Sequence, residues 1–141
     1  MDVDMNDHRH LERVNDNSLY KALGIKLTAF GGGAAKSELD APLPVQWPFE
    51  GQPHGGILFT QVDTTLATAM LPDLSGRFSC ATIGLDIQFT RRAQYGPFVC
   101  HGWTTHRGGK IGFGNAETRD ARGEIVVVAQ GTFRLIERTS D

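Results

Sequence analysis

The chain has 141 residues, and its 14 Lys and Arg against 16 Asp and Glu give a formal net charge of −2. One domain with one ordinary core is expected at this length, because about 68% of the extended chain's surface can be buried. The near balance of charge excludes a general basic field for nucleic acid or anionic lipid, so a phosphate-bearing ligand must be held locally.

The cysteines and histidines predict neither a disulfide framework nor a metal site. Cys80 and Cys100 form no CxxC pair and are expected to be buried or idle thiols. His101 lies beside Cys100 and so points to the opposite face of a strand, which argues against a catalytic cysteine. His101 and His106 are five residues apart and also face opposite ways. We therefore expect no metal and no cofactor.

The N-terminal part of the chain predicts an arm and a hairpin. Residues 1–17 are polar and charged without an apolar run, which predicts a mobile or weakly helical arm, no signal peptide and no membrane span. The expected compartment is the cytoplasm. Residues 19–24 form a helical turn that ends at glycine. Strands are predicted at 25–30 and 34–43, joined by the glycine turn at 31–33.

A loop rich in proline and aromatic side chains follows, over residues 45–51. Loops with aromatic side chains often line pockets, so Trp47 and Phe49 are candidate substrate contacts. The alternative, that both cap the edge of the core, is equally open.

Residues 54–71 predict one long buried helix with an unusual acid. At 100° per residue, one arc is apolar and the opposite side is polar. The apolar arc contains Leu58, Phe59, Val62, Leu66 and Met70, and the polar side contains Thr60, Gln61, Thr64, Thr65 and Thr68. Asp63 falls at the edge of the apolar arc. A carboxylate there is partly desolvated, which is costly unless compensated and marks a functional candidate.

The start of this helix has no Ser, Thr, Asp or Asn in the usual capping position, because His54, Gly55 and Gly56 follow Pro53 directly. Unclaimed amides at the positive end of a helix dipole suit an anion or a developing oxyanion. A glycine-rich turn into a core helix is the alternative. Asp63, nine residues after His54, favours the functional interpretation.

Four more strands are predicted after the helix. Residues 83–90 alternate strictly between apolar and polar side chains, and further strands are expected at 99–105, 111–119 and 125–136. The resulting order, β-β-α-β-β-β-β, favours an α+β domain in which an antiparallel sheet wraps one buried helix.

His-Gly-Gly, six mostly apolar residues and then Asp63 together resemble the helix signature of hotdog-fold acyl-CoA thioesterases. The similarity is to the phenylacetyl-CoA thioesterase-like branch of the 4-hydroxybenzoyl-CoA thioesterase superfamily. Residues 82–93, 107–110, 120–123 and 129–133 are similar to that family's later strands and turns, so the resemblance covers the chain from about Gln52 onward. It implies a single hotdog domain over residues 1–141, an antiparallel sheet around one central helix.

The resemblance implies hydrolysis of an acyl-CoA thioester, with Asp63 as general base or nucleophile. The amides of Gly55 and Gly56 would form the oxyanion hole, with His54 nearby. Thr82 stands where the family has a Ser or Thr that positions water, contributed from the partner subunit. The expected assembly is a homo-oligomer, either a dimer or a dimer of dimers, since a lone sheet leaves its edges unpaired.

Substrate contacts are expected from the helix, the preceding loop and the strand ends. Phe59 and Met70 are candidates on the helix, and Gln52 or Glu50 would replace a polar family residue at the position of Pro48. The candidates for contact with the coenzyme A phosphates are Arg91, Arg107, Gly108, Gly109 and Lys110. A solvated basic rim is the alternative interpretation of these cations.

Two other functions stay open. A non-catalytic acyl-CoA-binding or regulatory hotdog protein would keep the fold and pocket, yet it would have little need of Asp63 on an apolar helix face. A hotdog dehydratase or hydratase would also handle acyl thioesters, but that family places its acid and base residues differently.

Overall fold

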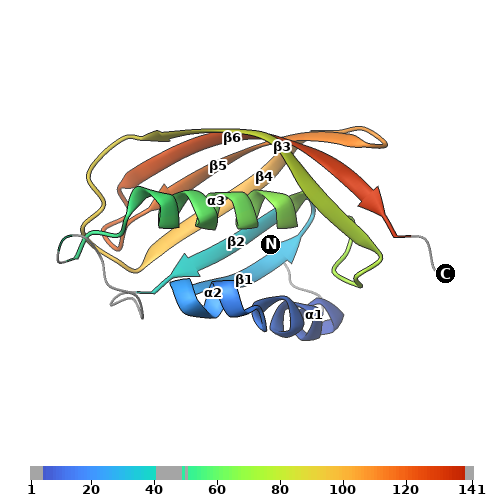
Figure 1. The fold of residues 1–141 in the computed structure, drawn as a ribbon, viewed down its shortest axis with the longest axis horizontal. Helices are drawn as coiled ribbons and strands as arrows, with labels where there is room; N and C mark the ends of the chain where they lie inside the picture. The colour runs from blue at the N-terminus through green and yellow to red at the C-terminus, as the bar shows by residue number, and fades with distance from the viewer. Residues whose placement is uncertain (1–4, 41–48, 50, 139–141) are drawn as a thin grey trace.

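The computed structural model describes residues 5–40, 49 and 51–138 (Figure 1). The helices are α1 (Met5–Asn15), α2 (Ser18–Leu23) and α3 (Gly55–Met70). The strands are β1 (Ile25–Gly31), β2 (Ala34–Leu39), β3 (Phe78–Phe89), β4 (Phe98–Arg107), β5 (Ile111–Arg119) and β6 (Ile125–Glu137). They form one antiparallel sheet in the order β1-β2-β4-β5-β6-β3. The predicted α+β hotdog architecture is confirmed.

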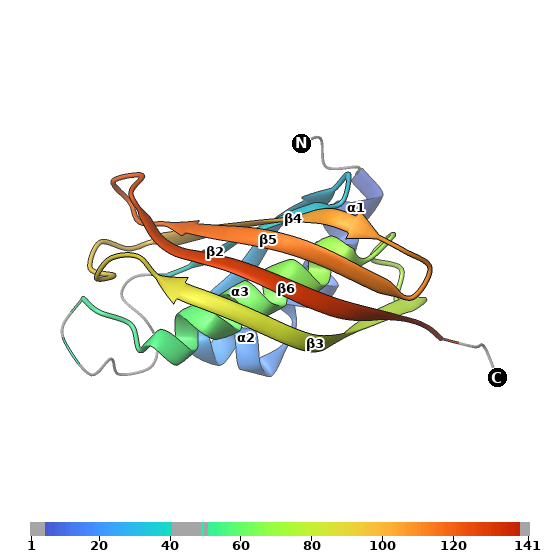
Figure 2. The same cartoon turned by 90° about the horizontal axis from the view of Figure 1, so that it is seen from above.

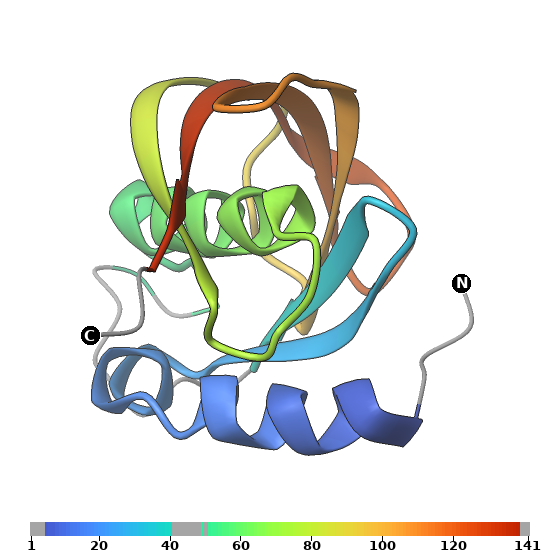
Figure 3. The same cartoon turned by 90° about the vertical axis from the view of Figure 1, so that its right-hand side faces the viewer.

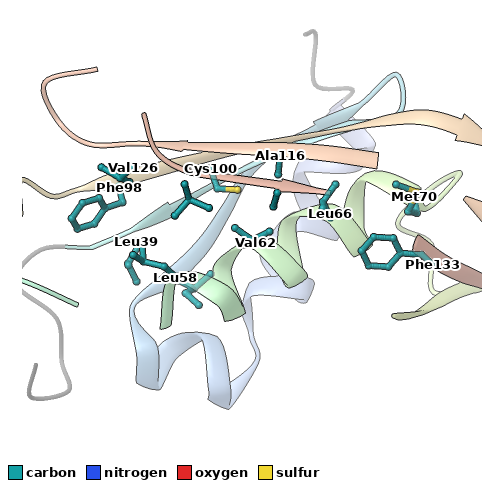
Figure 4. Close-up of a cluster of buried hydrophobic side chains, with 13 residues drawn as sticks. Leu39, Leu58, Val62, Leu66, Met70, Phe98, Cys100, Ala116, Val126 and Phe133 are labelled. Carbon is teal, nitrogen blue, oxygen red and sulfur yellow. The ribbon is translucent and has the colours of Figure 1, made fainter. Parts of the chain in front are cut away.

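The sheet curves around α3, which lies along its concave face (Figures 2 and 3). Leu58, Val62 and Leu66 recur along α3 at helical spacing and are at most 2% exposed. They pack against strand residues such as Phe98 and Phe133 (Figure 4). Burying each such side chain contributes about 1.5–3 kcal/mol, so this contact provides much of the domain's stability.

Two glycines of β5 let the end of α3 approach the sheet closely. A Cβ at Gly114 would lie 2.5 Å from Met70 Cε, and one at Gly112 would lie 2.9 Å from Met70 Sδ. Met70 is 1% exposed and belongs to the core. The expectation that it contacts substrate is wrong, because the side chain fills the trough that these glycines leave.

The polar side of α3 is buried as well, contrary to the expected opposition of apolar and polar faces. Gln61 and Thr65 are fully buried, while Phe59 of the expected apolar arc is 38% exposed. The hydroxyl of Thr65 donates to the carbonyl of Gln61 at 2.6 Å, and Gln61 Nε2 donates to the carbonyl of Phe98 at 3.0 Å. These bonds satisfy the Thr65 hydroxyl and Gln61 Nε2, so β2 and β4 can cover a polar helix surface, although Gln61 Oε1 is buried without a hydrogen-bond partner among the described residues.

The N-terminal arm is more ordered than expected. Residues 5–15 form α1, and Leu11 is buried with Leu27, Phe30 and Leu74. The guanidinium of Arg13 donates to the carbonyl of Leu74, which ties α1 to the connection between α3 and β3. The expected turn after it is α2, which ends at Gly24 with a φ of 77°. None of the described helices is long and apolar enough to cross a membrane.

Candidate active site

The N-terminus of α3 is capped by a residue that the sequence did not identify as a cap. The amide of Gly56 donates to Nδ1 of His54 at 2.8 Å, and the amide of Ile57 donates to the His54 carbonyl at 2.9 Å. The expectation of two free glycine amides is therefore wrong for Gly56. The amide of Gly55 has no acceptor within the described residues, so it is the donor left for a ligand.

His54 must be a neutral imidazole in this arrangement, since a nitrogen that accepts a hydrogen bond carries no proton. Its proton then lies on Nε2. The ring of Phe89 borders the same point, because a Cβ at Gly55 would lie 3.2 Å from its Cζ. Phe89 is 51% exposed, so an apolar surface lies open beside the Gly55 amide.

We expect His54→Ala to lower the free energy of unfolding by about 1 kcal/mol, because the first turn of α3 loses its cap. His54→Asn supplies another capping side chain and should restore most of that loss. Thermal or urea unfolding of the three proteins measures the difference. Equal stability of the wild type and the alanine variant would show that the cap contributes nothing.

Asp63 lies midway along α3 and is partly buried. The hydroxyl of Thr82 donates to its Oδ1 at 2.7 Å. Within the described ranges this is its only hydrogen-bond or ion-pair partner, so Oδ2 is free to accept a proton or attack a carbon. Phe59, one helical turn earlier, is exposed beside it.

A bulge in β3 brings Thr82 to this position. Thr82 pairs with Phe133 and Gly84 pairs with Thr132, so Ile83 is an extra residue between them. Since side chains alternate along a strand, the extra residue turns Thr82 to the face that α3 covers and leaves Ile83 59% exposed. Thr82 thus reaches Asp63 of its own chain, and the contribution of Thr82 to a site shared with a partner subunit stays a prediction.

The helix separates the two halves of the expected site. Gly55 and Asp63 are eight residues apart, which is about 12 Å along the helix axis. A single carbonyl accepts a hydrogen bond at about 3 Å on oxygen while its carbon is attacked from about 3 Å. One chain therefore cannot apply its own Gly55 amide and its own Asp63 to the same thioester.

The other residues predicted to contact substrate lie near one or the other end of α3. Trp47 lies outside the described residues. Phe49 is 68% exposed and its carbonyl accepts the amide of Gln52 at 3.0 Å, in the turn that precedes α3. Arg91 follows β3 near that end, with Glu124 at 3.5 Å.

The hairpin between β4 and β5, which contains Gly108 and Gly109, lies at the opposite end of α3 (Figure 1). There Arg107 donates to the carbonyl of Met70 at 3.0 Å and so satisfies the helix C-terminus. This bond uses one of the five N–H donors of the exposed Arg107 guanidinium, so its contact with a phosphate of coenzyme A stays a prediction. Lys110 follows in the same hairpin. No three His, Cys, Asp or Glu side chains gather as metal ligands in the part of the chain described.

The thiols are unsuited to nucleophilic catalysis. Burial, with a smaller effect of the Asp63 carboxylate, raises the pKa of Cys80 to about 11. Burial also raises the pKa of Cys100 to about 11. We expect native protein at pH 7.5 to resist alkylation by iodoacetamide, since the thiolate is the reactive form. Mass spectrometry of native and urea-unfolded samples measures the labelling, and rapid labelling of Cys80 in the native protein would contradict this prediction.

These features define a hotdog protein with a carboxylate on the exposed side of its central helix. Solved structures share the fold. The thioesterase HI1161 of Haemophilus influenzae has a TM-score of 0.79 and 21% identity, with 90% of both chains covered. The E. coli PaaI protein from the phenylacetic acid degradation operon has a TM-score of 0.78 and 22% identity, over 94% of this chain and 97% of that one.

The sequence match gives the family. The model of the thioesterase superfamily matches residues 51–127, more than half of the chain, so the chain belongs to this superfamily of hydrolases. A protein of Halobacterium salinarum that bears the provisional name of an esterase is 28% identical over 132 residues, covering 86% of this chain and 87% of its own length. The matched region contains His54, Gly55, Asp63 and Thr82.

Proposed function

We propose that the protein hydrolyses an acyl-CoA thioester to a free acid and coenzyme A. The observation that carries this proposal is the partly buried Asp63 with Thr82 on one of its oxygens, within the region that matches the thioesterase superfamily. A hydrolase needs a positioned base or nucleophile, and this carboxylate has one oxygen held and one free.

In the proposed reaction, Oδ2 of Asp63 either takes a proton from the attacking water or attacks the carbonyl carbon itself. The carbon–sulfur bond breaks, and the coenzyme A thiolate leaves and is protonated. If Asp63 is the nucleophile, the acyl group is left on it as an anhydride, which water then hydrolyses to the free acid and the restored carboxylate. The Gly55 amide would stabilise the negative charge on the carbonyl oxygen. One such donor lowers the activation free energy by about 3 kcal/mol. Thr82 is a positioning residue in this mechanism, because it acts on the substrate through Asp63.

The separation of Gly55 from Asp63 supports a site built by two copies of the chain. A two-fold axis that brings Gly55 of one copy to Asp63 of the other passes α3 midway between these two positions, at the level of Phe59. The two copies of α3 then run antiparallel, and each dimer contains two equivalent sites.

The surface that such a dimer needs is present along β3. This strand lies at the end of the sheet, so one of its edges has no partner strand among the described residues. Its exposed Phe89 borders Gly55, and the exposed Phe59 of α3 lies one helical turn before Asp63. A dimer of dimers and a cytoplasmic location stay predictions from the sequence.

Release of free thiol from short, medium, long and aromatic acyl-CoAs tests the proposed function. We expect at least one acyl-CoA to be hydrolysed. Conversion of an enoyl-CoA without thiol release would favour a hydratase. Tight binding of acyl-CoA without turnover would favour a binding protein.

A further inference from the structure

A cavity of about 860 Å³ lies between the N-terminal helices and β1, the strand at the edge of the sheet opposite to β3. Both helices pack against β1 (Figures 1 and 3). Charged side chains of α1 and the ring of Tyr20 on α2 line one wall, and the start of β1 around Ile25 lines the other. The volume is in the range of ligand-binding sites.

The outer edge of β1 directs a main-chain N–H and C=O into this cavity at Ile25. Along an antiparallel edge strand, these groups point alternately to the neighbouring strand and to the outside. The amide of Asp40 donates to the carbonyl of Gly24 at 2.9 Å, so Gly24 faces β2. Ile25 therefore faces outward, and so does Leu27. The Ile25 side chain is 4% exposed and belongs to the core, so its backbone is the part that borders the cavity.

Leu27 shows which chemical group suits an outward position of this edge. Nδ2 of Asn15 donates to the carbonyl of Leu27 at 2.8 Å, and the amide of Leu27 donates to Oδ1 of Asn15 at 2.8 Å. One carboxamide thus satisfies both main-chain groups. Ile25 presents the same pair about 7 Å away along the strand. No residue that the structure describes bonds to either group of Ile25. A buried main-chain pair without a partner is costly, so this position suits an amide from outside the chain.

The rim of the cavity carries unpaired charges of both signs. The cations of Arg9 and Lys26 and the carboxylates of Glu12 and Asp40 are exposed. Within the described ranges these four side chains form no hydrogen bond or ion pair. A ligand of uniform charge would meet like charges at this rim. An extended peptide with side chains of both signs would not, and each of its residues offers an N–H and a C=O on one side.

We propose that this cavity binds an extended peptide segment of a partner protein, one residue of which pairs with Ile25. The N–H of that residue donates to the Ile25 carbonyl, and its C=O accepts from the Ile25 amide, as when a strand is added to a sheet edge. Pairing ends there, because Asn15 occupies the next outward position at Leu27. The site lies at the edge opposite to β3, so it is compatible with the proposed dimer and independent of the proposed hydrolysis.

NMR titration of the ¹⁵N-labelled protein with capped tripeptides tests this site. The probes are acetyl-Glu-Val-Lys-amide and acetyl-Lys-Val-Glu-amide, which present the two charge orders. We expect at least one of them to shift the amide signal of Ile25 in a saturable way, with a Kd below about 1 mM. The same peptide with N-methylvaline at its centre lacks the N–H donor and should bind about tenfold more weakly.

Arg9→Gln removes one cation of the rim and should change the affinity for the bound peptide about threefold. Arg92→Gln is the matched control, because it removes an exposed cation that follows β3 at the other edge of the sheet. It should leave the affinity unchanged. Equal affinity of the wild type and both variants would place the peptide outside this cavity and overturn the proposal.

Two further outcomes would also overturn it. The absence of a saturable shift at Ile25 with either peptide would show that water alone satisfies the edge of β1. Equal affinity for the N-methylated peptide would show that the peptide binds without pairing with Ile25.

Discussion

Replacing Asp63 by asparagine is expected to lower kcat for acyl-CoA hydrolysis by about 100-fold or more, with little change in KM. The amide keeps the volume of the side chain and an oxygen that can accept the Thr82 hydroxyl, but it is neither a useful base nor a strong nucleophile. Substrate binding and the fold should persist. Steady-state thiol release beside thermal unfolding of both proteins measures the two effects separately.

Asp86→Asn is the matched control, because Asp86 is an exposed acid of β3, the strand of Thr82, and its Oδ1 accepts a hydrogen bond from Gln88. It should leave kcat unchanged. A folded Asp63→Asn protein with normal kcat would reject Asp63 as the reacting group. In that case a structural role predicts equal or higher stability, since a partly desolvated charge has been removed. The next candidate would be Glu50, which lies outside the described residues.

Mixing two inactive variants is expected to restore activity if two copies of the chain build each site. Asp63→Asn lacks the reacting carboxylate, and Gly55→Pro lacks the amide donor, which should lower kcat by about 100-fold. Proline is tolerated at the first position of a helix, so the variant should fold. In a mixed dimer, one site combines the intact Asp63 and the intact Gly55. Random exchange of subunits should therefore recover about one quarter of wild-type activity.

Gly55→Ala controls for steric effects, because it adds a Cβ at 3.2 Å from the Phe89 ring but keeps the amide. It should stay much more active than the proline variant. Chains with two different affinity tags allow mixed dimers to be isolated and assayed. No recovery in isolated mixed dimers would show that both groups act within one chain, contrary to the 12 Å separation estimated along the helix.

The order of the elements follows from the sequence because each element has its own hydrophobic period. The strict alternation before and after the glycine turns predicts the strands. The helical period of the apolar residues around Asp63 predicts the long helix that the strands enclose. Local chemistry also predicts the end of α2, since Gly24 adopts the left-handed conformation that glycine favours. The hotdog architecture needs little more than these patterns.

The facing of individual side chains was decided by tertiary packing. Strict alternation would put Thr82 on the same side as Gly84, away from α3, but the bulge at Ile83 reverses it. The burial of Thr65 depends on β2 and β4 covering a side of α3 that periodicity marks as polar.

The features of the candidate site also divide into those that the sequence determined and those that tertiary packing determined. The sequence by itself determined that Asp63 lies on the central helix and that His54, Gly55 and Gly56 begin it, since both follow from positions along one element. Only the tertiary structure decided that His54 accepts the Gly56 amide and that Arg107 donates to the carbonyl at the far end of α3. Such pairings depend on three-dimensional distances between side chains, which local periodicity does not specify.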